Sequence, residues 1–177
     1  TLGGRAILQE RLDGSMARLQ TSATSSLQIL GGKVVGIFLT GLAQVGVLIF
    51  GSTLLYGIVW GDWLAVIALI ISAALAATGW GLIFASAMQT PEQVTGVGSA
   101  AMLLFGAISG TFVQLENSIV NTVGAITPNQ WALQGFLKLG LGQSLTDILP
   151  NIGALWLMAA VLFGLSVLLF QRQARNA

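Results

Sequence analysis

The run "WLAVIALIISAALAATGWGLIFASAM" (Trp63–Met88) decides the fold class, because it contains no Asp, Glu, Lys or Arg. A helix needs about 20 largely apolar residues to cross the hydrocarbon core of a bilayer. Three further runs meet this requirement and also lack charged residues: Val34–Trp60, Val94–Val113 and Ile152–Phe170. The first of these is longer than a span needs, so it either tilts or ends near Tyr56. The sequence therefore predicts an all-α integral membrane protein with four transmembrane helices.

The overall composition agrees with this interpretation. Of the 177 residues, 55% are hydrophobic and 7% are charged, and the mean hydropathy is +0.86. A soluble domain carries roughly 25% charged residues. The chain has 23 glycines and no cysteine, so small residues can bring membrane helices close together, whereas disulfides and thiolate metal sites are excluded. The net charge of +1 gives no indication of a nucleic-acid partner.

Several classes of membrane enzyme are excluded by the residues that are missing. A Ser–His protease needs a histidine as its base, and the chain has none. Lys33 and Lys138, the bases for a Ser–Lys variant, lie outside the predicted spans, as do the carboxylates of Asp62 and Asp147. No cluster of metal ligands is present. We therefore predict no catalytic residue, no cofactor and no metal, and a transport subunit rather than an enzyme.

Basic residues are distributed unevenly between the two sides of the membrane. With four spans, both ends of the chain lie on the same side. That side carries Arg5, Arg11, Arg18, Lys33, Arg172 and Arg175. The other side carries only Lys138. By the positive-inside rule, both ends are expected in the cytoplasm, with the protein in the plasma (inner) membrane as a multi-pass protein.

These predictions divide the chain into five parts. They are a cytoplasmic loop (1–32), three transmembrane helices (33–113), an extracellular connection (114–150), the last transmembrane helix (151–171) and a cytoplasmic tail (172–177). The connection contains a short predicted helix from Pro128 to about Leu139, whose apolar residues suit contact with the outer leaflet or with the spans. Two interpretations stay open: a helix lying in the interface, or a re-entrant lid over an exit path.

Two similar motifs predict helix starts. "TPEQ" (Thr90–Gln93) and "TPNQ" (Thr127–Gln130) each place a threonine that can cap a helix before a proline at the first helical position.

The polar residues of the predicted spans are uncharged. Carriers driven by protons or sodium usually hold ionisable groups inside the membrane, so any uphill transport needs energy from a partner. Gln44 and Ser109 are the candidate residues of a substrate path. For Gln44, near the middle of its span, a hydrogen bond to a neighbouring helix is the simpler account, and contact with a substrate is the alternative.

The segment before the first span is polar but has a helical pattern. Leu8, Leu12, Met16 and Leu19 recur at helical spacing and form one apolar stripe. A helix of this kind can lie on the lipid surface or serve as a solvated connector.

Several motifs, taken in order, resemble the permease subunits of ABC type-2 exporters. The cytoplasmic motif is represented by Glu10, Arg11, Gly14, Ser15, Arg18 and Leu19, followed by Gly32 and Lys33. Later motifs are represented by Ser109, Gly110 and Phe112, and by Pro128, Trp131, Ala132, Gly135 and Phe136. Ser15 stands where threonine is commoner, and Ala23 stands where proline is frequent, which puts a local bend in doubt.

The resemblance implies a six-helix permease of which this chain holds the last four spans, beginning in a cytoplasmic loop. It implies that the helix around Glu10, Arg11, Gly14, Ser15, Arg18 and Leu19 couples the permease to an ATP-binding cassette subunit on a separate chain. It also implies an external gate that includes Pro128, Trp131 and Phe136. Two permeases, as a homodimer or a heterodimer, would form the working unit. A channel without an ATPase partner and a membrane scaffold are the alternatives.

Overall fold

The computed structural model describes residues 26–88, 90–109 and 124–176, which form five helices. They are α3 (Ser26–Tyr56), α4 (Trp63–Ala87), α5 (Pro91–Ile108), α7 (Pro128–Gly140) and α8 (Leu145–Asn176). Within these ranges no β-strand is present. The predicted all-α class is therefore confirmed.

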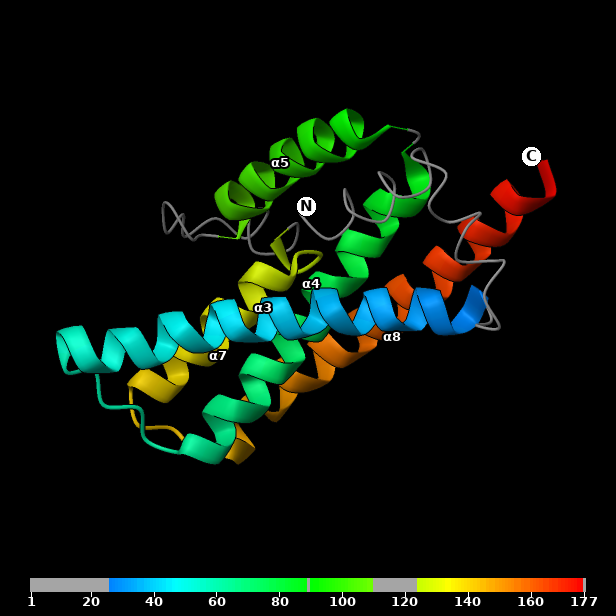
Figure 1. Cartoon of the computed structure of the whole chain (residues 1–177). Coiled ribbons are helices and arrows are strands. Elements are labelled where there is room, and N and C mark those ends of the chain that lie inside the picture. Colours follow the sequence, from blue (N-terminus) through cyan, green and yellow to red (C-terminus); the bar gives the residue numbers. More distant parts are fainter. Residues whose placement is uncertain (1–25, 89, 110–123, 177) are drawn as a thin grey trace.

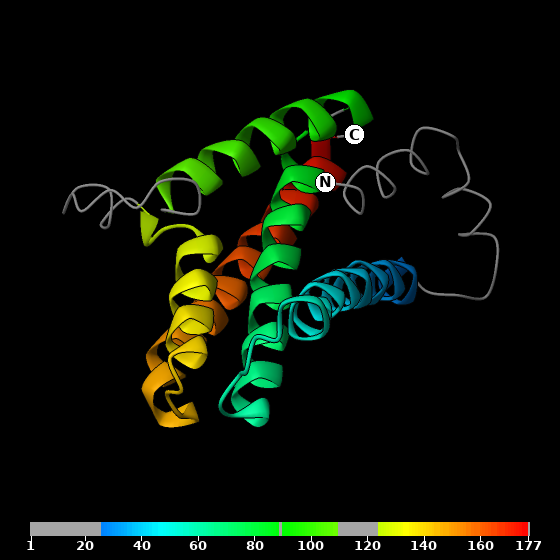
Figure 2. The ribbon, with the colours of Figure 1, turned by 90° about the vertical axis from the view of Figure 1, so that its left-hand side faces the viewer.

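Helix α4 lies at the centre of the described structure. It packs against α8 along much of its length and also contacts α3, α5 and α7. Figure 2 shows α3 on one side of α4 and α7 on the other, and Figure 1 shows α5 turning back from the end of α4 and diverging from it. Because α4 is apolar on all faces, it is suited to be surrounded by other helices.

The main hydrophobic core is built from α4, α7 and α8. Val66 and Leu69 of α4 meet Leu139 of α7 and Leu155 of α8, and all four side chains are fully buried. A smaller cluster joins the other end of α4 to α5 through Phe84 and Val94. The outward face of α3, in contrast, exposes large apolar side chains such as Leu54, as expected of a helix that faces lipid or another protein.

Within the described residues, three helical segments are long and apolar enough to cross a membrane: Val34–Tyr56, Trp63–Ala87 and Leu145–Leu169. The predicted third span corresponds to a shorter apolar helix, Glu92–Ile108, and the last residues predicted for it lie outside the described ranges. The membrane-helical character is thus confirmed for three of the four predicted spans, and the count of four stays a prediction.

Helix α3 ends at Tyr56, in agreement with one of the two interpretations of the over-long apolar run to Trp60. Helix α8 begins at Leu145, before the predicted start at Ile152, and includes Pro150. The early start follows from Asp147, which accepts hydrogen bonds from the backbone N–H and the hydroxyl of Ser144, both at 2.9 Å. This pattern satisfies free donors at a helix N-terminus.

The two predicted threonine caps behave differently. Thr90 caps α5, because its hydroxyl accepts a hydrogen bond from the backbone N–H of Gln93 at 3.3 Å. Thr127 precedes α7, but its hydroxyl instead donates to the backbone carbonyl of Gly124 at 2.7 Å. Thr127 is therefore the N-cap residue of α7, as predicted, but its side chain does not make the capping hydrogen bond. Its buried hydroxyl closes the turn before the helix.

The two connections at one end of the bundle touch each other. The backbone N–H of Gly61, between α3 and α4, donates to the carbonyl of Leu139 at 3.4 Å. A Cβ atom on Gly61 would lie 3.3 Å from the Cα of Gly142, which follows α7 and has a φ of +80°. Asp62 caps α4 at the same end by accepting from the N–H of Leu64 at 2.9 Å. The α3–α4 pair is thereby joined to the α7–α8 pair.

Replacing Gly79 by alanine should destabilise the protein, because the added Cβ would lie 2.9 Å from the Cβ of Leu162 and push α8 away from α4. Overpacking of this kind typically costs about 1–3 kcal/mol. Gly81→Ala is the matched control, since its Cβ would meet nothing within 4 Å. Thermal unfolding in detergent should show a lower Tm for Gly79→Ala alone. Equal Tm values for the two variants would contradict the close α4–α8 contact.

Candidate functional site

The six residues predicted to couple the protein to an ATPase lie outside the described residues. They are Glu10, Arg11, Gly14, Ser15, Arg18 and Leu19. Their assignment therefore stays a prediction.

The predicted gate residues occupy three different environments along α7. Pro128 is buried at the first position of the helix. Trp131 is partly buried and donates from its indole nitrogen to the carbonyl of Ala125 at 2.8 Å. Phe136 packs on the main core and meets the ring of Trp60 edge-on, with ring centroids 5.9 Å apart. Only Trp131 of the three lines the pocket described below.

Hydrogen bonds between polar residues fix α7 to α8. This contact was not predicted from the sequence. Lys138 donates to the side-chain oxygen of Asn151 and to the carbonyl of Asp147, both at 3.1 Å. Asn151, which is 1% exposed, also donates to the backbone carbonyl of Trp131 at 3.0 Å. An asparagine at the start of an apolar run could have indicated this contact, because a buried amide needs hydrogen-bond partners.

This arrangement bears on the two interpretations of the short helix. Gly135 lies so close to α4 that a Cβ atom there would be 2.6 Å from a methyl group of Leu69. With Asn151 holding its other side, α7 packs directly on two long apolar helices. The contacts show that α7 packs on the spans, and both interpretations of the helix stay open.

The two predicted substrate-path residues do not meet. Gln44 is exposed on α3, and the described structure gives its side chain no hydrogen bond. The interhelical bond expected for it is not formed among these helices. Ser109 is buried at the end of α5, where its hydroxyl donates to the carbonyl of Gly106 at 3.2 Å.

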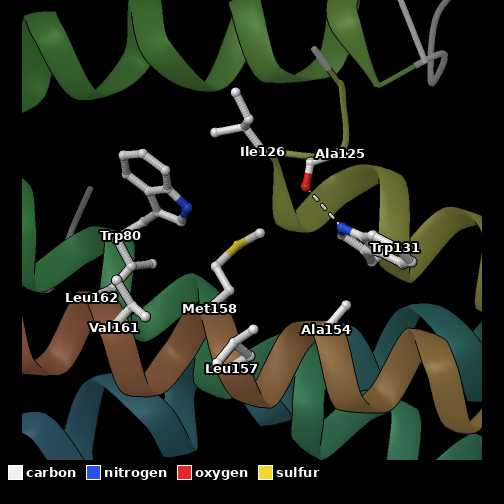
Figure 3. Close-up of a pocket in the computed structure, with 9 residues that line it drawn as sticks. All are labelled: Trp80, Ala125, Ile126, Trp131, Ala154, Leu157, Met158, Val161 and Leu162. Carbon is white, nitrogen blue, oxygen red and sulfur yellow. Dashed lines mark hydrogen bonds between the residues drawn. The ribbon is translucent and has the colours of Figure 1, made fainter. Parts of the chain in front are cut away.

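A pocket of about 460 Å³ lies between α4, α7, α8 and the segment that leads into α7. Figure 3 shows the nine lining residues, and α8 supplies five of them. The lining residues are Trp80, Ala125, Ile126, Trp131, Ala154, Leu157, Met158, Val161 and Leu162. None of these side chains is ionisable, so the pocket suits an uncharged, largely apolar molecule.

Two indole N–H groups are the polar side-chain groups of this lining. That of Trp131 is bonded to Ala125, as described above. The Nε1 atom of Trp80 is buried and has no hydrogen-bond partner among the residues that the structure describes. The Trp80 ring is held by Phe105, which meets it edge-on at a centroid distance of 4.8 Å, and by Phe84 at 5.8 Å. In Figure 3 its nitrogen faces the space around Met158.

Comparison with known proteins gives a match to a protein family and a match to an individual protein. A family model described as "ABC-2 family transporter protein" matches residues 1–168. The linearmycin resistance permease protein LnrN of Bacillus subtilis (strain 168) is 33% identical over 160 residues, which are 89% of this chain and 42% of that protein. The chain thus spans less than half the length of this curated relative. No solved structure matches the chain significantly.

Replacing Asn151 by leucine should loosen α7 from α8, because Lys138 and the carbonyl of Trp131 each lose a hydrogen-bond partner. Leaving a buried polar group unsatisfied costs about 1–3 kcal/mol. The chain has no cysteine, so Leu139→Cys, at a position that is 0% exposed, gives a single reporter for thiol labelling. Labelling should be faster in the Asn151→Leu background.

The matched control is Ser166→Ala, also on α8, whose hydroxyl bonds only to the carbonyl of Leu162 in its own helix among the bonds observed. Labelling of Leu139→Cys should not change in this background. Equal labelling rates with Asn151→Leu and Ser166→Ala would show that the Lys138–Asn151 contact does not hold α7 in place.

Proposed function

This chain belongs to the ABC-2 transporter family, and we propose that it is the membrane-spanning permease subunit of an ATP-driven exporter. The family and the apolar helices make it a multi-pass membrane transport subunit. The match from residue 1 to residue 168 carries the proposal, because it includes the polar first segment as well as the helices. ATP hydrolysis is assigned to a separate chain.

A partner that hydrolyses ATP would supply the energy for uphill transport, because the helices themselves hold no groups that could couple transport to an ion gradient. The segments Val34–Tyr56, Trp63–Ala87 and the part of α8 from Ile152 to Leu169 contain no Asp, Glu, Lys, Arg or His. Bound protons or sodium ions usually require such groups inside the membrane. An ATP-binding cassette subunit that docks on the cytoplasmic segment around Arg18 fills this role, and a pair of permeases, identical or different, completes the unit.

The proposed topology places α5 across the membrane as the third of four spans, with both ends of the chain in the cytoplasm. The connections at Gly61 and Gly142 then lie on the outer side, and α7 extends inward from that side. In this orientation six basic residues lie on the cytoplasmic side and one lies on the outer side, as the positive-inside rule requires. In this arrangement Trp131 of α7 forms part of the external gate.

The substrate class follows from the pocket and from the relative. The lining residues bear no charge, and the relative is named for resistance to linearmycin. We therefore expect an apolar or amphiphilic small molecule, drug-like or lipid-like, to be exported. Linearmycin itself is the first compound to test.

Arg18→Glu should uncouple export from ATP hydrolysis, because it reverses a charge in the predicted docking helix. Losing one partner of a buried charge pair at an interface costs about 2–5 kcal/mol. Co-purification of the ATP-binding subunit and linearmycin resistance should both fall, while membrane insertion stays normal.

Arg5→Glu makes the same charge change outside the predicted docking helix and should leave both measurements unaltered. If the Arg18→Glu permease still retained its ATPase and full export activity, the coupling assignment would be wrong.

Trp131→Ala should allow substrate to cross vesicle membranes without ATP, because it removes the ring at the proposed gate. Complete burial of such a ring is worth about 3–5 kcal/mol, and Trp131 is only partly buried, so the protein should still fold. Trp131→Phe keeps a ring and serves as the control. Unchanged leak and export in the alanine variant would support a passive interfacial helix.

A further inference from the structure

We infer that the connection between α3 and α4, residues 57–62, is a membrane-binding turn that lies at the boundary between lipid headgroups and acyl chains. We call this segment the α3–α4 turn. Its partner is the lipid surface, not the water outside the membrane and not a second protein. The inference requires only that α3 and α4 cross the membrane, and it goes beyond the proposed function because it involves neither an ATPase nor a transported substrate.

The turn and the residues beside it expose apolar and aromatic side chains. Tyr56, Val59 and Leu64 are 78%, 81% and 74% exposed. Leu141, in the neighbouring connection between α7 and α8, is 81% exposed. Figure 1 shows both connections at the same end of the bundle. Turns that project into water carry polar side chains as a rule, so the composition of this end favours contact with lipid.

Several polar groups of the turn have hydrogen-bond partners inside the protein. The indole N–H of Trp60 donates to the hydroxyl of Thr53 at 3.0 Å. The backbone N–H of Gly57 donates to the carbonyl of the same threonine at 3.0 Å. The backbone N–H of Gly61 donates to the carbonyl of Leu139 at 3.4 Å. Backbone groups need such internal partners where lipid replaces water, and a turn surrounded by water does not.

The single charge of the turn, the carboxylate of Asp62, also has partners within the protein. Its Oδ1 atom accepts from the backbone N–H groups of Leu64 and Ala65, at 2.9 and 3.4 Å, and so caps α4. Residues 57–61 contain no Asp, Glu, Lys, Arg or His. Burying a charge is costly unless it is hydrogen-bonded, and here the only carboxylate already is. The turn can therefore approach the acyl chains without leaving a charge uncompensated.

Aromatic rings indicate the depth of the turn in the membrane. Trp63 stacks on Phe50 with ring centroids 5.4 Å apart, which joins the start of α4 to α3. Trp63 and Tyr56 are both exposed, and such rings are enriched where the membrane meets water. The exposed apolar face of α3 reaches this level through Leu54 and Leu55. The surface of the turn is thus continuous with a face that is suited to contact hydrocarbon.

A lipid surface accounts for these features better than a protein partner does. Protein interfaces form about one hydrogen bond per 100–200 Å², whereas the side chains exposed here are mainly hydrocarbon. Transfer of a valine-sized side chain from water to lipid is favoured roughly ten- to hundredfold. Irregular backbone exposed to lipid is not found deeper in the hydrocarbon, so the turn stays at the headgroup boundary.

The test places a nitroxide spin label on Val59→Cys of the full-length permease in liposomes. This chain contains no cysteine, and any cysteine elsewhere in the permease is first replaced by serine. Electron paramagnetic resonance then measures collisions of the label with oxygen, which concentrates in hydrocarbon, and with a neutral nickel chelate, which stays in water. We expect collisions mainly with oxygen, at a depth of about 5–10 Å into the boundary between headgroups and acyl chains.

Two further labelled variants calibrate the measurement. Val47→Cys, at a position near the middle of α3 that is 72% exposed, should report hydrocarbon. Glu92→Cys, exposed in the first turn of α5 after the other connection of α4, should report water. Monodisperse elution and an unchanged Tm show that each variant folds.

A second measurement tests whether the apolar side chains hold the turn in the lipid. The label is placed on Leu64→Cys, which should give the same profile as Val59→Cys. Adding Val59→Asp should raise the nickel collisions of this label several-fold, because a carboxylate draws the turn toward water. Val59→Ile keeps the surface apolar and should leave the collisions unchanged.

Three results would overturn the inference. Collisions of Val59→Cys mainly with the nickel chelate would place the turn in water. Few collisions with either reagent would mean that protein covers the turn, from a second copy or from another part of the permease. An unchanged profile with Val59→Asp would mean that the apolar side chains do not anchor it. None of these results depends on ATP-driven export, so the proposed function is tested separately.

Discussion

The close contact of α4 with α8 is the constraint on which the rest of the described structure depends. At Gly79 the absence of a side chain lets the backbone of α4 approach Leu162. In lipid, helices gain little from hydrophobic burial and associate through close packing of small residues. Once these two helices are paired, their shared surface fixes α7 on one side, while α3 occupies another side of α4 (Figure 2). The pocket forms where α5 diverges and leaves part of that surface uncovered.

The uncharged polar residues of the spans serve mainly their own helices. The hydroxyls of Thr78 and Ser166 donate to backbone carbonyls four residues earlier, at 2.7 and 2.8 Å. Such bonds satisfy the side chain where no water is present. Ser72 makes the same type of bond and also accepts from Trp156, which links α4 to α8. Polar character in these spans is therefore compatible with an apolar substrate path.

Local features of the fold could be predicted from sequence, whereas contacts between distant segments could not. Uninterrupted apolar runs predicted α4 and α8, and Pro128 marked the start of α7. The cap at Thr90 was correct because it depends on neighbouring residues alone. Thr127 stands in the same motif, yet Gly124 offers its hydroxyl a nearer partner. The contact of Lys138 with Asn151 and the unpaired Trp80 depend on how helices pack, which periodicity does not reveal.

The junction of the two connections at Gly61 and Gly142 has a mechanical consequence. Two helix pairs that rotate about a shared contact separate most at the ends farthest from that contact. The junction lies at the start of α4, and Trp80 lies toward its other end. Any rotation between the α3–α4 pair and the α7–α8 pair about this junction therefore changes the distances around Trp80 more than those around Leu139. A small angular change at one end of the molecule becomes a change in pocket width at a distance.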